Sequence, residues 1–412
     1  MKRCVHIISL YTVFMPKSNT KSGHIYIDYA ASASPNPSSI HTEGVFAKRT
    51  LEDARRIVAS LLAAHPDEII FTSGATESNN LAIQGVINYL TPTLSLTRRG
   101  RREKWILPHI ITTNIEHPSV LETCRMLEER KLTEVTIVPV ERSGIIDPEK
   151  IKKAIKKNTV LVSVMYANNE IGTIQPIREI AKVIRHYKKS KSGKDTLPLL
   201  HVDAVQAANY LDLNVERLGV DLLSLTGSKV EGAGRIGVLY KKRNVTLAPL
   251  FGGGDQERGL RPGTENVLGV AEFANACALA RTNFEREAKR LTELRDYFLE
   301  KLQKVSRGVL DITINGNLKE RLPNNLNITF GKIPSDLIVL ELSARGVMAS
   351  SKSACKSSSS EGSYVLKAIN PDFDPEVGGV RFSFGRDTKK TDIDYTISTL
   401  QKIVAKHKKW YT

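Results

Sequence analysis

The stretch Phe71-Thr-Ser-Gly-Ala-Thr-Glu-Ser-Asn-Asn80 holds the end of an apolar strand, a turn of small residues and the start of a helix. We predict a strand over Glu68 to Phe71 and a helix from Glu77. Apolar runs and helical patterns alternate in the same way further along. Strands are expected at His109 to Thr113, Val135 to Val140, Val160 to Met165, Leu199 to Val202, Leu222 to Leu225 and Ile236 to Tyr240, with helices from Pro118, Asp147 and Ile177. This alternation favours an α/β domain around a largely parallel sheet.

A second domain is predicted after the α/β region. A long charged helix starts at about Val270, is rich in helix formers from Arg281 to Lys304, and precedes a shorter mixture of strands and helices. We assign residues 34–275 to a large α/β domain, and residues 24–33 and 276–412 to a small α+β domain. The 412 residues, 41% hydrophobic and 25% charged, suffice for two domains with cores of their own.

Four cysteines are present, Cys4, Cys124, Cys277 and Cys355, and they form no CxxC or CxxH pair. Neither a disulfide framework nor a metal site is therefore indicated, and a reducing cytoplasm is the expected compartment. Cys124 and Cys277 lie in amphipathic helical stretches and are expected to be small buried hydrophobes.

The first residues imitate a secretory signal. Met1-Lys-Arg is followed by the apolar run from Cys4 to Met15, but no A-x-A-like cleavage site follows, and no later run is long enough to span a bilayer. We therefore expect residues 1–23 to be disordered or a non-native extension, with Met15 as an alternative first residue.

The formal net charge of +16 comes from scattered basic clusters without interleaved aromatic residues. Such clusters are usually solvated surface, so direct binding of nucleic acid or of a membrane is not expected. An acidic protein partner and an RNA substrate of a sulfur pathway are both compatible with the charge.

Several polar residues follow predicted strands, where ligands bind in open α/β sheets. Thr76 lies in a turn that can present backbone N–H groups to an anion, and His117 can lie flat on an aromatic ring. Amides at Asn169 and Gln206 can bond a phenolate, and Asp203 can pair with a pyridinium nitrogen. These residues also have purely structural alternatives. The Thr76 segment can be a plain helix cap, and His117 can be a structural histidine. Asn169 can lie in an ordinary turn, and Asp203 can be a buried aspartate that caps a helix.

Two further residues are candidates for covalent chemistry. Lys229 ends the run Ser224-Leu-Thr-Gly-Ser-Lys229 after an apolar strand, where an amine can bond a carbonyl carbon. Cys355 lies in the polar run Ser350-Ser-Lys-Ser-Ala-Cys355, and its neighbours Lys352 and Lys356 should lower its pKa. The alternative for this second run is a Ser-rich disordered linker. Together with the polar residues above, these groups are what a pyridoxal phosphate ring needs.

Seven segments, in this order and spacing, resemble the cysteine desulfurases of the class V aminotransferase superfamily. They are FTSGATESNN (71–80), EHPSV (116–120), NNEIG (168–172), HVDAVQ (201–206), GGGDQERGLRPGTENV (252–267), SSKSAC (350–355) and RFSFGR (381–386). The resemblance covers nearly the whole chain from His24. It implies a pyridoxal phosphate-dependent transferase of fold type I, with a mostly parallel seven-stranded sheet in the large domain, a smaller α+β domain, and active sites at the interface of a homodimer.

The resemblance also implies roles for single residues. Lys229, Cys355 and His117 would be catalytic, with Lys229 as cofactor anchor and base and Cys355 as sulfur acceptor. Arg381 and Asn169 would bind the substrate. The cofactor would be held by Ala75, Thr76, His117, Asn169, Asp203, Gln206, Thr226, Ser228 and Lys229, and by Thr264 reaching from the neighbouring subunit.

The implied reaction converts L-cysteine to L-alanine and leaves a persulfide on Cys355. The sulfur would pass to an acceptor protein of iron–sulfur cluster assembly or tRNA thiolation. Two alternatives remain: a selenocysteine lyase, and a degenerate desulfurase-like scaffold that binds a partner.

The chain departs from the family pattern at four places. Ser228 stands where relatives have histidine, and Gly232-Ala-Gly-Arg235 replaces a Gly-Pro-Lys-Gly turn. Lys352 stands where relatives commonly have glycine. Asp28 to Ser32 runs almost directly into Asn36, where relatives insert a helix. We expect Ser228 to weaken retention of the cofactor.

Overall fold

The computed structural model describes residues 26–32, 34–96, 106–190, 197–230, 233–306, 311–351, 362–407 and 410. The α-helices are α2 (Thr42–Leu62), α3 (Ala75–Leu96), α4 (Pro118–Glu129), α5 (Pro148–Ala154), α6 (Ile177–Ser190), α7 (Val215–Leu218), α8 (Val267–Ser306), α9 (Ser335–Ser343), α10 (Tyr364–Ile369) and α11 (Lys390–His407). Short 3₁₀ helices are η1 (Pro66–Glu68), η2 (Gly227–Lys229) and η3 (Gln256–Gly259). The strands are β1 (Ile69–Thr72), β2 (His109–Thr113), β3 (Glu134–Val138), β4 (Thr159–Met165), β5 (Leu199–Asp203), β6 (Leu222–Thr226), β7 (Gly237–Lys241), β8 (Ile312–Ile314), β9 (Asn325–Phe330) and β10 (Val380–Ser383).

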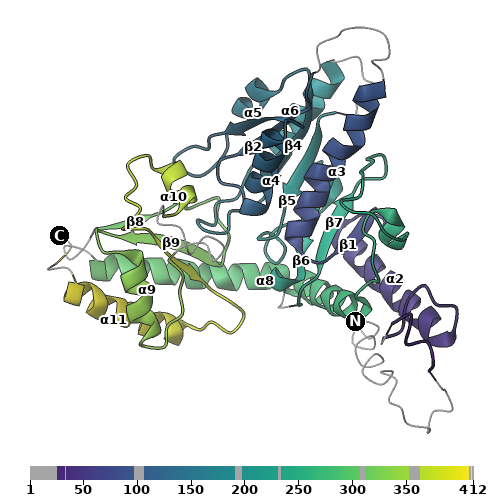
Figure 1. Cartoon of the computed structure of the whole chain (residues 1–412). Coiled ribbons are helices and arrows are strands. Elements are labelled where there is room, and N and C mark those ends of the chain that lie inside the picture. Colours follow the sequence, from purple (N-terminus) through teal and green to yellow (C-terminus); the bar gives the residue numbers. More distant parts are fainter. Residues whose placement is uncertain are drawn as a thin grey trace.

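Seven strands form one sheet in the order β1-β7-β6-β5-β4-β2-β3 (Figure 1). The pairs β2–β3, β2–β4, β4–β5 and β5–β6 are parallel, whereas β7 is antiparallel to both of its neighbours. The predicted α/β fold with a mostly parallel seven-stranded sheet is confirmed. The carboxyl ends of β2, β4, β5 and β6 consequently meet at one edge.

Both faces of this sheet are buried. Successive strand residues point to opposite sides, so that Ile110 and Leu222 join the core under α3 and α4, whereas Ile111 and Leu223 join the core on the other face. Helices cover each face, as expected for strands that are apolar on both sides.

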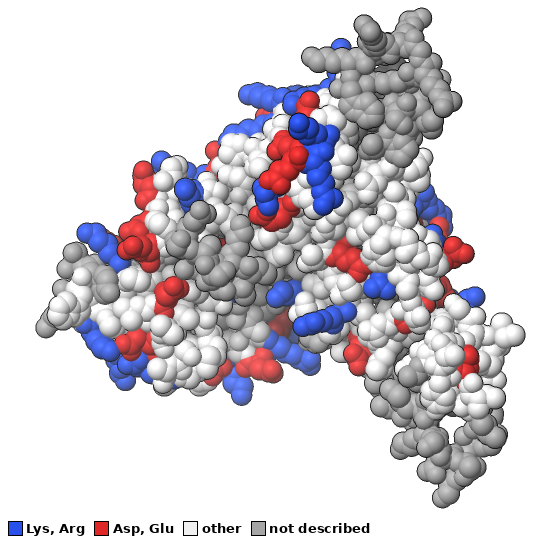
Figure 2. Space-filling view, viewed as in Figure 1, with Lys and Arg blue, Asp and Glu red and all other residues white. Residues whose placement is uncertain are grey.

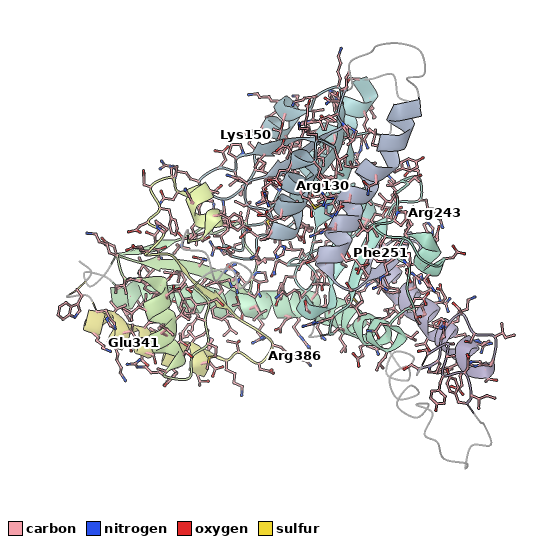
Figure 3. The ribbon with its side chains drawn as sticks, in the orientation of Figure 1. Arg130, Lys150, Arg243, Phe251, Glu341 and Arg386 are labelled. Carbon is pink, nitrogen blue, oxygen red and sulfur yellow. The ribbon has the colours of Figure 1, made fainter. Side chains whose placement is uncertain are left out.

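A smaller antiparallel sheet, β10-β9-β8, belongs to the second core, which α8, α9 and α11 complete (Figure 1). In this region lies Glu341 of α9 (Figure 3). Its carboxylate binds Lys406 at 2.6 Å and His407 at 3.0 Å, both on α11. These contacts, with Arg345, lower the pKa of Glu341 to about 2. This part is the predicted smaller α+β region, but the boundaries of the two domains stay a prediction.

Helix α8 contributes to both cores. Phe273 and Cys277 from its first half are buried in the core of the large sheet, and Leu291 and Phe298 from its second half are buried in the smaller core. The helix begins at Val267, three residues before the predicted start, and α3 begins two residues before the predicted Glu77. Sequence patterns place the ends of helices only to within a few residues, and both differences are of that size.

Helix α2 lies beside α8 and is not among the helices predicted from the sequence. Its N-cap is His41, whose side chain accepts from the N–H of Gly44, and it ends at the left-handed Ala63. In the described part of residues 26–40 no helix forms. Asp28 instead accepts from Ser39 Oγ at 3.0 Å and lies 3.2 Å from His41 Nε2.

Cys124 and Cys277 are buried free thiols, as predicted, and burial raises the pKa of Cys124 to about 12. Cys4 and Cys355 lie outside the described residues. Figure 2 shows lysine and arginine interspersed with acidic side chains on the face in view. Among the described residues, every helix is too short or too polar to cross a membrane.

Candidate active site

A cavity of about 340 Å³ is lined by residues that end or follow β1, β2, β4, β5 and β6. Loops after parallel strands meet at the carboxyl edge of a sheet, which is where α/β proteins bind ligands. The cavity brings together these predicted site residues: Ala75, Thr76, His117, Asn169, Asp203, Gln206, Thr226, Ser228 and Lys229.

Lys229 closes the 3₁₀ turn η2 directly after β6. Its carbonyl oxygen accepts from Asn209 Nδ2 at 2.7 Å, which fixes the backbone, and its side chain is exposed toward the cavity. The position leaves the amine accessible to a carbonyl carbon in the cavity.

Asp203, the last residue of β5, is buried beneath the cavity. Its Oδ2 accepts from Asn79 Nδ2 at 2.8 Å, and its Oδ1 accepts from the Val205 N–H at 3.1 Å. Burial raises the pKa of Asp203, and these two bonds and the nearby His117 oppose the rise. The carboxylate therefore suits a cationic partner such as a protonated ring nitrogen.

His117 is the N-cap of α4 and precedes Pro118, which suits the first helical position. Its Nδ1 accepts from the Ser119 N–H at 3.1 Å, and the Ser119 hydroxyl lies 2.8 Å from the same atom. Burial lowers the pKa of His117, Asp203 raises it and Lys229 lowers it further. With Nδ1 acting as an acceptor, the neutral ring carries its proton on Nε2.

The turn before α3 forms an anion cup. The first N–H groups of a helix have no acceptor within the helix, and the residues at the start of this one, Gly74, Ala75 and Thr76, line the cavity. Strand β7 approaches the turn so closely that a Cβ on Gly237 would lie 2.2 Å from Thr72 Oγ1 and 2.5 Å from the Gly74 backbone. Only glycine fits at position 237, and this contact positions the cup.

Thr226 and Ser228 line the other side of the cavity. The Thr226 hydroxyl donates to the Ile236 carbonyl at 3.2 Å, and the two hydroxyls are 3.4 Å apart. The cavity wall thus carries two short hydroxyl side chains at this place.

Asn169 connects the cavity to Arg381. The Oδ1 atom of Asn169 is buried and has no hydrogen-bond partner in the described part of the chain. Its carbonyl oxygen accepts from Arg381 Nη1 at 2.9 Å. Arg381 does not line the cavity itself, and burial lowers the pKa of its guanidinium.

Besides Arg381, one described residue of the predicted site, Thr264, does not line the cavity. Thr264 is exposed in the loop between η3 and α8, and its role at a neighbouring subunit stays a prediction. Cys355 lies outside the described residues, so its distance from Lys229 is undefined.

Two residues that link the others, Asn79 and Ser119, were not predicted from the sequence. Asn79 Nδ2 donates to Asp203 and also to Ser119 Oγ at 2.9 Å, and Ser119 contacts His117. A hydrogen-bonded chain therefore joins Asp203 to His117. Both residues lie inside the quoted motifs FTSGATESNN and EHPSV, but the motifs alone do not show which members touch. Arg235, which lines the cavity, was noted only as a departure in the turn.

The arrangement fits pyridoxal phosphate. The cup offers donors for a phosphate, and Asp203 offers a buried carboxylate for the ring nitrogen. The buried Oδ1 atom of Asn169, which has no hydrogen-bond partner among the described residues, can accept from a donor group of a ligand. Lys229 offers the amine for covalent attachment.

The chain is similar to known proteins over most of its length. The sequence profile of the family described as Aminotransferase class-V matches residues 19–396. The cysteine desulfurase IscS of Dictyoglomus turgidum is 41% identical over 399 residues, which cover 93% of this chain and 95% of the relative. The cysteine desulfurase IscS of Methanosarcina thermophila is 40% identical over 371 residues, covering 90% of this chain and 85% of the relative.

Among solved structures, one described as a NifS-like protein superposes with a TM-score of 0.78 at 32% identity, covering 90% of this chain and 91% of its own. The similarity in sequence and in structure thus extends over both cores of the molecule. The chain belongs to the class-V aminotransferase family and, within it, to the pyridoxal phosphate-dependent cysteine desulfurases.

Proposed function

We propose that this protein converts L-cysteine to L-alanine and takes the released sulfur on Cys355 as a persulfide. The observation that carries the proposal is the convergence of Lys229, Asp203, His117 and the anion cup on one cavity, although they come from four separate segments. Membership of the cysteine desulfurase family supports the choice of L-cysteine as substrate.

The cofactor, when bound, supplies a conjugated ring that accepts the electron pair left at the substrate's Cα when its proton departs. Asp203 would hold the ring nitrogen, and Thr76, Thr226 and Ser228 would hold the phosphate. Asn169 and Gln206 would bond the ring oxygen.

Lys229 would transfer the proton, because this residue lies in the turn directly after β6 and lines the cavity. Its Nζ would take the proton from the substrate's Cα and return a proton to the product. His117 would lie against the ring as a neutral imidazole, since burial lowers its pKa. Its Nε2–H can donate to a group in the cavity.

Arg381 would bind the substrate carboxylate. A guanidinium forms two parallel hydrogen bonds with a carboxylate, and the contact with the Asn169 carbonyl fixes its orientation. The Cys355 thiolate would then attack the substrate sulfur. An S–S bond forms, the Cβ–S bond breaks with its electron pair remaining on carbon, and that carbon takes a proton. One L-cysteine and one thiol thus give one L-alanine and one persulfide.

Further parts of the proposal concern partners and location. A homodimer would bring the exposed Thr264 of one subunit to the cofactor phosphate of the other. The persulfide sulfur would pass to a protein acceptor of iron–sulfur cluster assembly or tRNA thiolation. The absence of paired cysteine motifs in the sequence supports a cytoplasmic location.

The test is the formation of alanine from L-cysteine by the protein loaded with pyridoxal phosphate, with a reductant as sulfur acceptor. We expect alanine from the parent and none from Cys355→Ala or Lys229→Ala. Cofactor absorbance shows whether each variant is loaded, and circular dichroism shows whether it is folded. A folded, loaded parent that forms no alanine contradicts the proposal, and alanine from Cys355→Ala contradicts the role of the thiol.

A further inference from the structure

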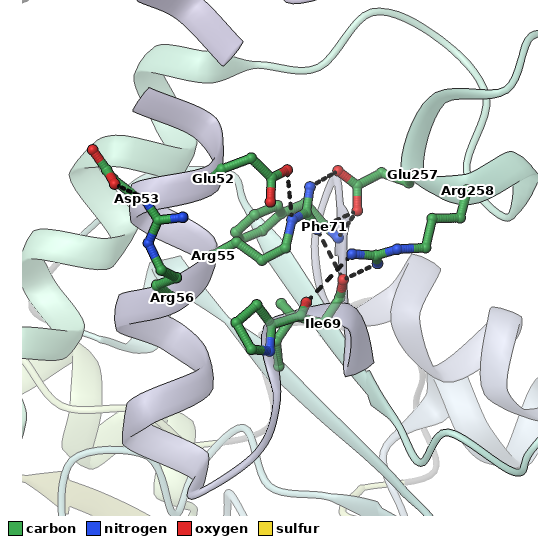
Figure 4. A network of polar contacts seen from close by, with 9 residues as sticks. Glu52, Asp53, Arg55, Arg56, Ile69, Phe71, Glu257 and Arg258 are labelled. Carbon is green, nitrogen blue, oxygen red and sulfur yellow. Dashed lines mark hydrogen bonds and ion pairs between the residues drawn. The ribbon is translucent and has the colours of Figure 1, made fainter. Parts of the chain in front are cut away.

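The loop between β7 and α8 is attached to helix α2 by a buried ion pair between Arg55 and Glu257 (Figure 4). Glu257 accepts from Arg55 through both carboxylate oxygens, each at 2.8 Å, and the two side chains are 1% and 4% exposed. Glu257 Oε2 also accepts from the Phe71 N–H at 2.9 Å. Phe71 is two residues before Ser73 of the anion cup, so the loop is held next to the cup.

The backbone of this loop is strained where the ion pair holds it. Glu257, Arg258 and Gly259 all adopt left-handed conformations, with φ of 46°, 60° and 72°. Such conformations in residues other than glycine persist where surrounding contacts determine them. Arg258 adds a hydrogen bond from Nη1 to the Ile69 carbonyl at 3.0 Å. The direction in which the loop leaves this turn is therefore fixed.

Two residues after the turn, Arg261 reaches the cup itself. Its Nε donates to Glu77 Oε1 at 3.1 Å, with side chains that are 25% and 13% exposed. The other oxygen of Glu77 accepts from the Ser73 N–H at 2.7 Å and from the Ser73 hydroxyl at 2.5 Å. Glu77 thus closes the first turn of α3 and lines the cavity at the same time.

This position creates a conflict of charge. The N-terminus of a helix carries a partial positive charge that stabilises a nearby anion. The Glu77 carboxylate and a bound phosphate would both lie at the N-terminus of α3. Two anions so close together repel each other, and the repulsion is screened little in a partly buried cavity. Arg261 is the cation that contacts the Glu77 carboxylate and can cancel its charge.

We propose that Arg261 is a positioning residue that neutralises Glu77, so that the anion cup accepts the phosphate of the cofactor. The buried Arg55–Glu257 pair and the left-handed turn keep Arg261 in place. The inference rests on the proposed function for the identity of the anion, but it concerns binding and not turnover.

The test compares pyridoxal phosphate with pyridoxal, which lacks the phosphate, in equilibrium titrations of the apo-protein. Arg261→Gln should raise the Kd for pyridoxal phosphate about tenfold, because Glu77 is then uncompensated, and should change the Kd for pyridoxal by less than about twofold. In the double variant Arg261→Gln, Glu77→Gln the Kd for pyridoxal phosphate should return to within about threefold of the parent, because glutamine still caps Ser73 without a charge.

The matched control is Arg243→Gln, which removes an exposed cation of the same β7–α8 loop that pairs with Asp67 and not with Glu77. It should leave the ratio of the two Kd values unchanged. Two results would show a structural role for the ion pair and overturn the proposal. One is an equal rise in the Kd for both ligands in Arg261→Gln. The other is a Kd for pyridoxal phosphate in the double variant that is as high as in Arg261→Gln. If the parent binds pyridoxal phosphate but forms no alanine, the proposed function fails while the Kd comparison still decides the inference. A parent that does not bind it contradicts both.

Discussion

Ser350 and Arg381 are joined through their backbones and their side chains. The Arg381 N–H donates to the Ser350 carbonyl at 2.7 Å, the Ser350 N–H donates to the Arg381 carbonyl at 3.2 Å, and Arg381 Nη2 donates to Ser350 Oγ at 3.3 Å. Ser350 precedes Cys355 by five residues. Arg381, the proposed ligand of the substrate carboxylate, is therefore bonded directly to Ser350, which lies five residues before the proposed sulfur acceptor Cys355.

The variant Arg381→Lys tests this clamp. Lysine keeps the charge but loses the planar fork that binds a carboxylate through two bonds. We expect the KM for L-cysteine to rise about tenfold, a loss of about 1.4 kcal/mol, with a smaller change in kcat. Steady-state formation of alanine measures both constants. The surface variant Arg386→Lys serves as control (Figure 3), and an unchanged KM in Arg381→Lys contradicts the clamp.

Asn79 is expected to support the cofactor through Asp203. Asn79→Ala removes a hydrogen bond that lowers the pKa of Asp203, so the carboxyl becomes a weaker partner for a cationic ring nitrogen. We expect the Kd for pyridoxal phosphate to rise about tenfold, as for a hydrogen bond to a charged group. Asn80→Ala, at the next helical position, is the control, since Asn80 bonds Thr76 and Thr123 instead. Similar Kd values for the two variants contradict the role of Asn79.

Ser228 is expected to weaken retention of the cofactor. Its hydroxyl lies 3.4 Å from that of Thr226, whereas an imidazole at this position would place an N–H donor further into the cavity. Ser228→His should slow the dissociation of pyridoxal phosphate about tenfold, measured by transfer to an excess of an apo-enzyme that binds it tightly. An unchanged dissociation rate would show that the hydroxyl holds the phosphate as well as a histidine does.

The buried Glu116 gives stability a specific pH dependence. Burial raises its pKa to about 8, above the ordinary value near 4.5, so the folded state keeps a proton that the unfolded chain releases between these values. Stability is therefore highest on the acid side of this window and falls as the pH rises from about 4.5 to 8, with a slope of at most about 1.4 kcal/mol per pH unit. Glu116→Gln should flatten this slope.

Urea unfolding between pH 5 and 8 measures the effect. The exposed Glu376 gives the matched control, because its replacement by glutamine changes no buried charge. If the parent and Glu116→Gln lose stability in parallel as the pH rises, Glu116 is not the titrating group.

Much of the fold could be predicted from the sequence, because each strand of the large sheet is a short apolar run bounded by turn residues. The residues that follow these runs, such as His117 and Asn169, were predicted to meet, and the parallel order of the strands explains why they do. The residues at which helices and strands begin and end were harder to predict. Helix α3, for example, begins at Ala75 because Glu77 reaches back to cap Ser73.

Contacts between distant segments could not be predicted. Arg55 and Glu257 are 202 residues apart, and no local pattern connects a helix residue with a loop residue at that separation. The same holds for Asn79 and Asp203, 124 residues apart. Asn79 has the pattern of an ordinary helix residue, and only the folded sheet shows that it faces the carboxylate.

The 40 residues of α8 form a rod about 60 Å long that belongs to both hydrophobic cores. A continuous ladder of backbone hydrogen bonds therefore runs from one core into the other. Neither core can unfold without exposing apolar residues of this helix or breaking the ladder between them. The two halves of the molecule should consequently melt together, as a single cooperative unit.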